Sequence, residues 1–197
     1  MVEVTGPRIA AIVIVYVCTA NVNRSPMAAA LTSHLAATRG LELTVGSAST
    51  LLRPGHRASP ATLAVLRARG IDAESHRSRT LTPELVAGAE LVLTMERVHL
   101  RVAALMAPGA FDKTFTLKEF LRRALRTDAR YAYEPLDRYL QRISIGRDPV
   151  ELLMTNEADE VADPQGGPQA GFVAICDELA LLCEGVVELL FGNAQPG

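Results

Sequence analysis

The 197-residue chain contains few cysteines, and their spacing gives them no structural role. There are three of them, Cys18, Cys176 and Cys183, and no two form a C-x-x-C pair. So sparse and odd a set excludes a disulfide framework and a zinc site of the usual spacing. Cysteines that stay unpaired belong in a reducing compartment, so we expect a cytoplasmic protein.

Aromatic residues and excess charge are also scarce: there is no Trp, there are four Tyr and five Phe, and the net charge is −2. Without a basic field, nucleic acid is not an expected partner. The apolar run Ile9 to Val17 is too short to cross a bilayer and lacks the flanks of a signal peptide, so we expect no membrane association. The four histidines have no metal-binding spacing, and we expect each at the surface or in a loop: His34, His56, His76 and His99.

Strand and helix signals, in contrast, are abundant and alternate along the chain. Ile9 to Val17 is a continuous β-branched run, typical of a central parallel strand. Further strands are predicted over Leu41–Ser47, Leu91–Thr94 and Thr114–Phe115. Helices are predicted from Pro26 to Arg39 with a stop at Gly40, from Pro60 (capped by Ser59) to Gly70, from Leu117 onward, and from Gln169 to Leu190. This alternation predicts a single α/β domain, residues 1–197, with a four-stranded, mostly parallel sheet.

One segment, residues 122–160, fits the alternation poorly, and we expect it to be a helical insertion on the rim of that domain. It contains seven arginines: Arg122, Arg123, Arg126, Arg130, Arg138, Arg142 and Arg147. Their simplest interpretation is a solvated helical face. A docking surface for an acidic or phosphorylated partner is the alternative.

The most informative motif joins the first predicted strand to the first helix and reads Cys18-Thr19-Ala20-Asn21-Val22-Asn23-Arg24-Ser25-Pro26. Five residues between Cys18 and Arg24 let the backbone curl until its N–H groups converge on a tetrahedral dianion. Arg24 can then bind two phosphate oxygens, and the same N–H groups favour a thiolate at Cys18. Ser25, followed by Pro26, is the expected helix N-cap. On the motif alone, Cys18 could still be an ordinary small core residue.

The motif resembles the C-x-G-N-x-C-R-S-P loop of the low-molecular-weight protein tyrosine phosphatases, matching it at Cys18, Asn21, Arg24, Ser25 and Pro26. Gly46-Ser47-Ala48-Ser49-Thr50 is similar to the S-A-G-T segment of that family, and Asp163-Pro164 is similar to its D-P motif. The similarity covers Ile9 to Lys118 and Glu160 to Leu190. It implies a three-layer fold of the phosphotyrosine protein phosphatase I type, with helices on both faces of the sheet.

The resemblance also implies a two-step phosphoryl transfer that needs no metal or cofactor and releases inorganic phosphate. Cys18 would be the nucleophile, and Asp163 the general acid and base. The phosphate would be bound by the loop residues Thr19, Ala20, Asn21, Val22, Asn23 and Arg24, with Asn21, Ser25 and Ser47 supporting the loop. Asp148, also followed by Pro, is a rival for the acid, but its surroundings predict a helix cap, so Asp163 is favoured.

The chain departs from the family mainly around the site. Asn23 stands where many members have a second Cys, Ala20 replaces a Gly, and Gln165 follows the D-P pair where the family often has an aromatic residue. The substrate wall is expected to comprise Val22, Leu51, Leu52 and Gln165, none of them aromatic. Val22 favours an aryl phosphate, because arginine phosphatases of the family carry Thr at this position.

A phosphorylated protein, most simply one carrying phosphotyrosine, or a small aryl phosphate is therefore the expected substrate. A thiol-dependent arsenate reductase of the same fold and a phosphate-binding protein without catalysis stay open as alternatives. Cys176 and Cys183 are two helical turns apart, so they share a face. We expect this face to be a buried stripe with Phe172, Leu179 and Leu190, in preference to a redox relay.

Overall fold

A computed structural model describes residues 12–52, 54–131, 134–154 and 156–192. The described strands are β1 (Ile12–Cys18), β2 (Leu43–Ser49), β3 (Leu91–Thr94) and β4 (Thr114–Thr116), in the spatial order β2-β1-β3-β4. All three pairings are parallel, so the carboxyl ends of the strands meet at one edge. The predicted four-stranded sheet is confirmed. Residues 9–11 of the first predicted strand lie outside the described residues.

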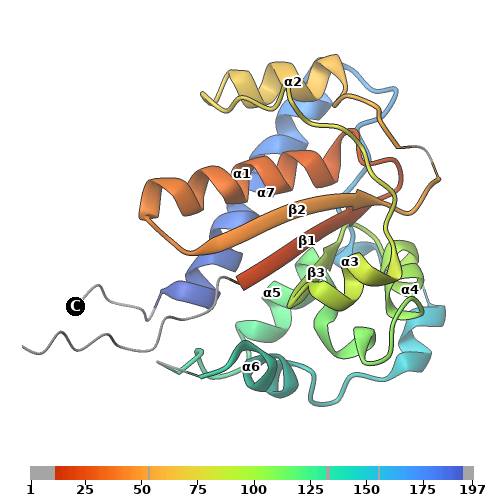
Figure 1. Ribbon diagram of the computed structural model, residues 1–197, viewed down its shortest axis with the longest axis vertical. Coiled ribbons are helices and arrows are strands. Elements are labelled where there is room, and N and C mark those ends of the chain that lie inside the picture. Colours follow the sequence, from red (N-terminus) through yellow and green to blue (C-terminus); the bar gives the residue numbers. More distant parts are fainter. Residues whose placement is uncertain (1–11, 53, 132–133, 155, 193–197) are drawn as a thin grey trace, which may run out of the picture.

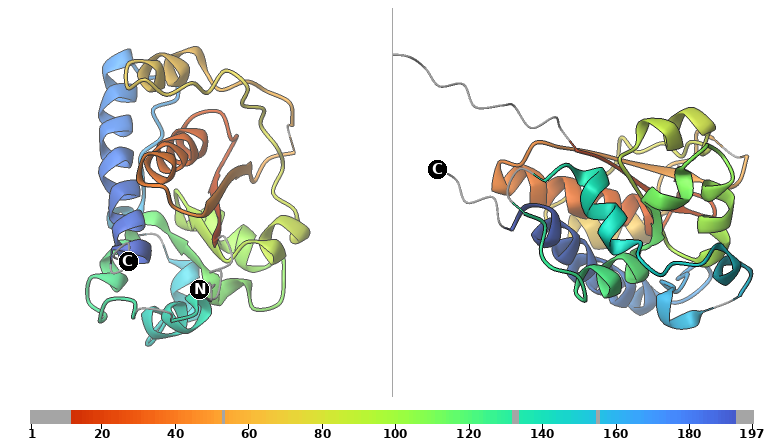
Figure 2. Two further views of the ribbon diagram at one scale, coloured as in Figure 1. Left: turned by 60° about the vertical axis from the view of Figure 1, so that its left-hand side comes forward. Right: turned by 90° about the horizontal axis from the view of Figure 1, so that it is seen from below.

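Helices cover both faces of the sheet (Figures 1 and 2). On one side lie α1 (Arg24–Arg39), α2 (Pro60–Arg67), α5 (Leu117–Ala124) and α7 (Gln169–Phe191); on the other lie α3 (Pro83–Gly88) and α4 (Arg97–Ala104). Alternate residues of β1 serve the two layers, because side chains of a strand point to opposite faces. Ile14 and Tyr16 belong to the core under α1 and α7, whereas Val15 and Val17 belong to the core under α3 and α4. The three-layer prediction is therefore confirmed.

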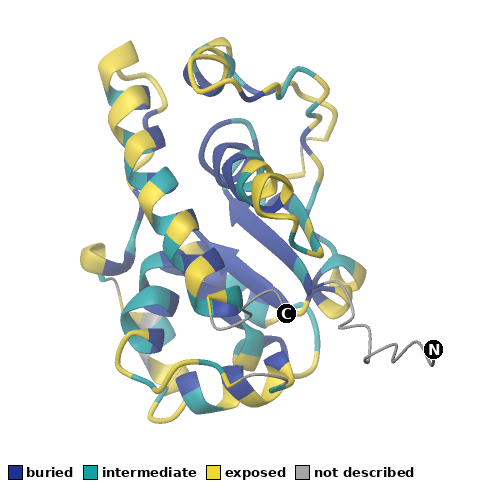
Figure 3. Cartoon of the chain, turned by 90° about the vertical axis from the view of Figure 1, so that its left-hand side faces the viewer, coloured by how far each residue is buried: buried dark blue, intermediate teal, exposed yellow. Residues whose placement is uncertain are grey.

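The cysteines of α7 lie on the buried stripe that the sequence predicts. Cys176 and Cys183 are almost fully buried, together with Phe172, Leu179 and Leu190. Figure 3 shows the buried and exposed stretches alternating along this helix. Burial raises the pKa of the Cys183 thiol to about 11, and burial also raises the pKa of Cys176. Both are therefore protonated at neutral pH and poor redox partners. Among the described residues, no helix is long and apolar enough to cross a membrane.

Several predicted boundaries differ from the structure by one to three residues; helix α2, for example, ends at Arg67 and not at Gly70. Two of the differences have clear local reasons. Strand β2 begins at Leu43, two residues later than predicted, because the chain first closes helix α1. Gly40 adopts a left-handed conformation with φ 64°, and the N–H of Leu41 donates to the carbonyl of Ala36. Helix α1 begins at Arg24, so the prediction that Ser25 is its N-cap is wrong. By contrast, Ser59 does cap α2, accepting from the N–H of Thr62.

The arginine-rich segment, residues 122–160, contains the end of α5, helix α6 (Leu136–Ile143) and two 3-10 turns (Pro149–Leu153 and Glu157–Asp159). A further 3-10 turn, Ala110–Lys113, precedes β4. Helix α6 packs on the main core through Leu136, Tyr139, Leu140 and Ile143.

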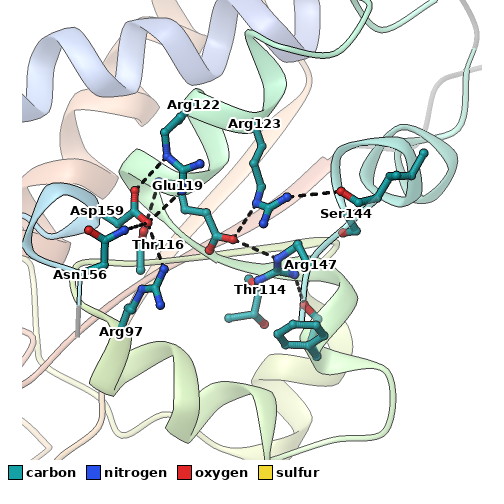
Figure 4. Close-up of polar contacts among 12 residues, drawn as sticks. Arg97, Thr114, Thr116, Glu119, Arg122, Arg123, Ser144, Arg147, Asn156 and Asp159 are labelled. Atoms are coloured by element: carbon teal, nitrogen blue, oxygen red, sulfur yellow. Dashed lines mark hydrogen bonds and ion pairs between the residues drawn. The ribbon is translucent and has the colours of Figure 1, made fainter. Parts of the chain in front are cut away.

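Five of the seven arginines of this segment donate to carboxylates or backbone carbonyls within the protein, so the prediction of a solvated helical face is wrong for them: Arg122, Arg123, Arg130, Arg142 and Arg147. Figure 4 shows three of these, Arg122, Arg123 and Arg147. The buried carboxylate of Asp159 accepts from Arg122 at 2.9 Å and from Arg97 of α4 at 3.3 Å. The buried carboxylate of Glu119 accepts from Arg123 at 2.9 Å and from Arg147 at 3.1 Å. Buried carboxylates, which the sequence pattern does not show, draw these arginines inward.

Candidate active site

The loop between β1 and α1 is shaped by one left-handed residue. Asn21 has φ 55° and is the only residue other than glycine with a positive φ in the described ranges. Asn is among the residues that tolerate this conformation. Ala20 has no positive φ, so an alanine fits where the family has glycine.

A directed chain of hydrogen bonds orients the Cys18 sulfur. The backbone N–H of Arg79 donates to Asn21 Oδ1 at 3.1 Å, which fixes the amide so that Asn21 Nδ2 donates to Ser25 Oγ at 2.9 Å. Since Ser25 Oγ accepts there, its own proton is free for Cys18 Sγ, 2.9 Å away. A hydroxyl donating to sulfur stabilises the thiolate. This contact also explains why Ser25 does not cap the helix.

The second loop supports the first through Ser49. Its hydroxyl donates to the carbonyl of Thr19 at 2.5 Å, and the N–H of Leu51 donates to the same carbonyl at 3.1 Å. Ser47, the expected support, instead contributes its carbonyl, which accepts from Arg79 Nε at 2.9 Å. The Arg79 guanidinium passes so close to Gly46 that a Cβ there would lie 2.3 Å from Nη2, so a larger residue at this position would displace the Arg79 side chain.

Two histidines contact the loop from Cys18 to Arg24, the predicted phosphate loop, and for His99 the prediction of a surface or loop residue is wrong. His99 lies in α4, is 1% exposed, and places Nε2 2.8 Å from Thr19 Oγ1. Burial lowers its pKa to about 4, so the ring is neutral at pH 7. Its Nδ1 is buried without a partner among the described residues. The tautomer that leaves no buried N–H unpaired therefore carries the proton on Nε2 and donates to Thr19.

His76 lies in a loop, as predicted, but is half-buried. Its Nε2 donates to the carbonyl of Asn21 at 2.8 Å, which helps to hold the left-handed residue. Burial lowers the pKa of His76, so it too favours the neutral form. His34 and His56 are exposed, as predicted.

Arg24 is almost fully buried and lies between two carboxylates. Its Nη1 donates to the Val161 carbonyl at 3.0 Å and contacts Glu96, while its Nη2 donates to Asp163 Oδ2 at 2.7 Å. Its Nε is buried and has no partner among the described residues. Nη2 also lies 3.4 Å from Thr19 Oγ1. Both terminal nitrogens are thus engaged, and the edge formed by Nε and Nη2 retains one unpaired donor, Nε.

Glu96 is a site residue that sequence reasoning missed. It lies two residues after the end of β3, at the carboxyl edge of the sheet where loops of parallel folds form sites, and this position was the available signal. His99 was missed for a related reason. It shares the buried face of α4 with Leu100 and Ala103, the i, i+1, i+4 pattern of a core-facing stripe.

The structure brings Asp163 to Arg24 and assigns Asp148 elsewhere. The second oxygen of Asp163, Oδ1, accepts from the backbone N–H of Gln165 at 3.1 Å. Asp148 accepts from the N–H of Val150 at 2.8 Å, at the start of a 3-10 turn, which is the capping role that its sequence context predicts.

The four residues of the predicted substrate wall differ in their exposure and in their contacts. Val22 is half-buried in the loop, Leu51 and Leu52 are exposed, and Gln165 is exposed but bonded to Asn23. The backbone N–H of Leu51 is bonded to the carbonyl of Thr19, so the Leu51 backbone lies beside the Cys18–Arg24 loop. Arg53 lies outside the described residues.

Comparison with known proteins places this geometry in a family. The model of the family described as low molecular weight phosphotyrosine protein phosphatase matches residues 13–142. The chain belongs to this family. Its sequence is 37% identical over 177 residues to a protein-arginine-phosphatase of Geobacillus stearothermophilus, covering 90% of this chain and 95% of the relative. It is 30% identical over 110 residues to the low molecular weight protein-tyrosine-phosphatase Etp of Escherichia coli, covering 56% of this chain and 72% of the relative.

Solved structures of the family agree with the fold. A cysteine-to-serine variant of the YwlE arginine phosphatase, with a phosphorylated active-site serine, superposes with a TM-score of 0.71. It is 28% identical, and the match covers 92% of this chain and 97% of that one. The present chain is therefore a hydrolase of the low-molecular-weight phosphatase type.

Proposed function

We propose that the chain hydrolyses phosphotyrosine in proteins through a cysteinyl-phosphate at Cys18. The observation that carries this proposal is the open edge of Arg24. Glu96 and the Val161 carbonyl fix Nη1, whereas the buried Nε has no partner among the described residues. When Asp163 releases Nη2, the Nε and Nη2 donors can bind two oxygens of one phosphate group, which is the bidentate geometry that guanidinium favours.

In the first step, the Cys18 thiolate attacks phosphorus, the S–P bond forms, and the bond from phosphorus to the leaving oxygen breaks. Ser25 Oγ–H stabilises the thiolate before attack. Protonated Asp163 delivers its proton to the leaving phenolate oxygen. Arg24 and the N–H groups of the loop stabilise the charge on the equatorial oxygens throughout.

In the second step, water attacks the cysteinyl-phosphate. Asp163, now a carboxylate, takes a proton from the water, the S–P bond breaks, and inorganic phosphate leaves with the Cys18 thiolate restored. The phosphorylated serine in the YwlE variant supports a covalent intermediate in this family.

Phosphotyrosine is proposed as the substrate because Val22 is apolar and the loop residue Leu51 offers a further apolar surface for a ring. Phosphoarginine is the second candidate, because the 37% identical relative is a protein-arginine-phosphatase. A comparison of kcat/KM on otherwise identical phosphotyrosine and phosphoarginine peptides decides between them. The higher value on phosphoarginine would overturn the preferred substrate.

The alternatives are less well supported. An arsenate reductase would need further reactive thiols, but Cys176 and Cys183 are buried and have raised pKa values. A protein that only binds phosphate would not need Asp163 beside Arg24. Because the nucleophile is a free thiol, we propose that the enzyme acts in the reducing cytoplasm.

The direct test of function is Cys18→Ser. We expect wild-type protein to release phosphate from an aryl phosphate and the variant to release none above background, while the variant still binds inorganic phosphate. Turnover by Cys18→Ser at the wild-type rate would refute the cysteinyl-phosphate route.

A further inference from the structure

Two of the positions at which the chain departs from its family touch each other. Asn23 replaces the second cysteine, and Gln165 replaces the aromatic residue after the D-P pair. They are 142 residues apart in sequence, yet Asn23 Nδ2 donates to Gln165 Oε1 at 2.7 Å. This bond joins the phosphate loop directly to the segment that carries Asp163.

The Asn23 amide is held in the orientation that this bond requires. Thr62 Oγ1 donates to Asn23 Oδ1 at 3.1 Å, and Thr62 is itself fully buried in α2. Ser59 Oγ donates to the same Thr62 oxygen at 3.1 Å, so the Thr62 proton is directed at Asn23. With Oδ1 occupied as the acceptor, Nδ2 is the group that faces Gln165, and Asn23 is 4% exposed.

Gln165 extends the connection to the acid. Its backbone N–H donates to Asp163 Oδ1 at 3.1 Å, while its side chain accepts from Asn23. On the other side of Asp163, the N–H of Val161 donates to the carbonyl of Met95 at 2.8 Å. Asp163 therefore lies between two attachments, one to Met95, the residue after β3, and one to Asn23 of the Cys18–Arg24 loop.

We propose that Asn23 is a positioning residue for the general acid. Through Gln165, it holds the Asp163 segment over the phosphate loop, so that the carboxyl faces the leaving oxygen. This proposal rests on the proposed function. It assigns to the two departures one shared role, which neither the second cysteine nor the aromatic residue of the family could fill by hydrogen bonding of this kind.

Leaving groups of different basicity separate positioning of the acid from general damage to the site. Phenolate is a poor leaving group with a pKa near that of tyrosine, about 10, and needs the proton from Asp163. The 4-nitrophenolate anion is much less basic and leaves with little help. A misplaced acid should therefore slow phenyl phosphate hydrolysis selectively.

The experiment measures kcat and KM on phenyl phosphate and 4-nitrophenyl phosphate for Asn23→Ala, Gln165→Ala and the double variant. The quantity compared is kcat/KM, because it reports only the steps up to formation of the cysteinyl-phosphate and so excludes the later role of Asp163 as a base. We expect each single variant to lower kcat/KM on phenyl phosphate by about threefold to tenfold, the usual effect of one hydrogen bond. The kcat/KM on 4-nitrophenyl phosphate should stay within about twofold, and the double variant should be no worse than the worse single one. Gln169→Ala, an exposed glutamine at the start of α7, is the matched control and should leave both rates unchanged.

The ratio of the two rates within one variant does not depend on how much of the protein is folded. Equal losses on both substrates, or losses that add in the double variant, would overturn the positioning role. If wild-type protein hydrolyses neither substrate, the proposed function itself fails, a result distinct from either of these.

Discussion

Arg24 and Arg147 both have buried side chains, but they differ in how many of their side-chain nitrogens have a hydrogen-bond partner. Arg147 donates from Nε to Glu119, from Nη1 to the Phe111 carbonyl at 2.7 Å and from Nη2 to the Thr114 carbonyl at 2.7 Å. Its guanidinium also lies about equally close to two rings, 4.1 Å from the Phe111 centroid and 4.0 Å from the Phe115 centroid. Every nitrogen of Arg147 is engaged, whereas Arg24 keeps Nε unpaired among the described residues.

The pairing of the donors distinguishes an arginine with a structural role, in which every donor has a partner, from one that we propose binds a ligand, in which one donor is unpaired. An unpaired buried donor costs folding free energy and is retained where a ligand supplies its partner. Arg147 satisfies its donors within the chain and fastens the arginine-rich segment to β4 and α5. Arg24 is fixed at Nη1, and we propose that its Nε and Nη2 bind phosphate once Asp163 moves away from Nη2.

Arg24→Lys is expected to have the largest effect, and it tests whether the unpaired donor of Arg24 is used in catalysis. A lysine ammonium retains the positive charge but not the fork that binds two oxygens, so we expect kcat/KM on phenyl phosphate to fall by at least about 10³-fold. The free energy of unfolding, measured in urea, should change by less than about 1 kcal/mol, because Glu96 and Asp163 are partly exposed to water. Activity within tenfold of wild type would show that the open edge of Arg24 has no catalytic use.

Asp163→Asn tests the partner that Arg24 must release. Without a transferable proton, kcat should fall by about 10²- to 10⁴-fold on phenyl phosphate, with KM nearly unchanged. Asp148→Asn is the control, since that residue only caps a 3-10 turn, and its kcat should stay within about twofold. A large loss in Asp148→Asn and none in Asp163→Asn would reverse the assignment.

Arg147→Met should produce the opposite phenotype to Arg24→Lys. The change removes three polar contacts and leaves Glu119 buried with one fewer partner, so the free energy of unfolding should fall by about 3–5 kcal/mol. The folded fraction should keep its kcat/KM within about twofold. Arg138→Met, at an exposed site of α6, serves as the control and should alter stability by no more than about 0.5 kcal/mol. A stable but inactive Arg147→Met protein would contradict the structural role.

The smallest expected effect concerns the neutral His99 ring beside the loop. Because its pKa is about 4 in the folded chain and about 6.5 when unfolded, acid favours protonation of the unfolded chain. The stability that depends on neutral His99 is fully present above about pH 6.5 and is lost as the pH falls towards 4. His99→Gln retains a donor for Thr19 but does not titrate. The stability of wild type relative to this variant should therefore decline from pH 7 to pH 4; a difference that is constant with pH would contradict it.

Local patterns predicted the parts of the molecule that depend on near neighbours in sequence. The β-branched run gave β1, and the spacing from Cys18 to Arg24 identified the loop. Gly40 and Ser59 marked helix ends correctly. In each case, the residues that determine the structure lie within a few positions of one another.

Contacts between segments far apart in the chain could not be predicted from the sequence. Ser25 has a hydroxyl that suits a cap, and only the fold shows that Cys18 and Asn21 engage it instead. Nothing near Arg147 in sequence reveals that Glu119 lies beneath it, so its arginine-rich context suggested a solvated face. For Glu96 and Asn23 the decisive partners are 72 and 142 residues away.

The attachment of Val161 has a kinetic consequence. Its N–H is bonded to Met95 and its carbonyl to Arg24, and the N–H of Gly167 closes a turn onto the Pro164 carbonyl at 2.9 Å. Only Ala162 and Asp163 stand between the fixed residue and this turn. Because the backbone is attached on both sides, we expect the Asp163 carboxylate to leave Arg24 and the Gln165 N–H by rotation about its own side-chain bonds, a motion of picoseconds to nanoseconds, while the backbone stays in place. The proposed acid would then be ready on a timescale far shorter than the microseconds to milliseconds that enzymes with closing lids require before each turnover.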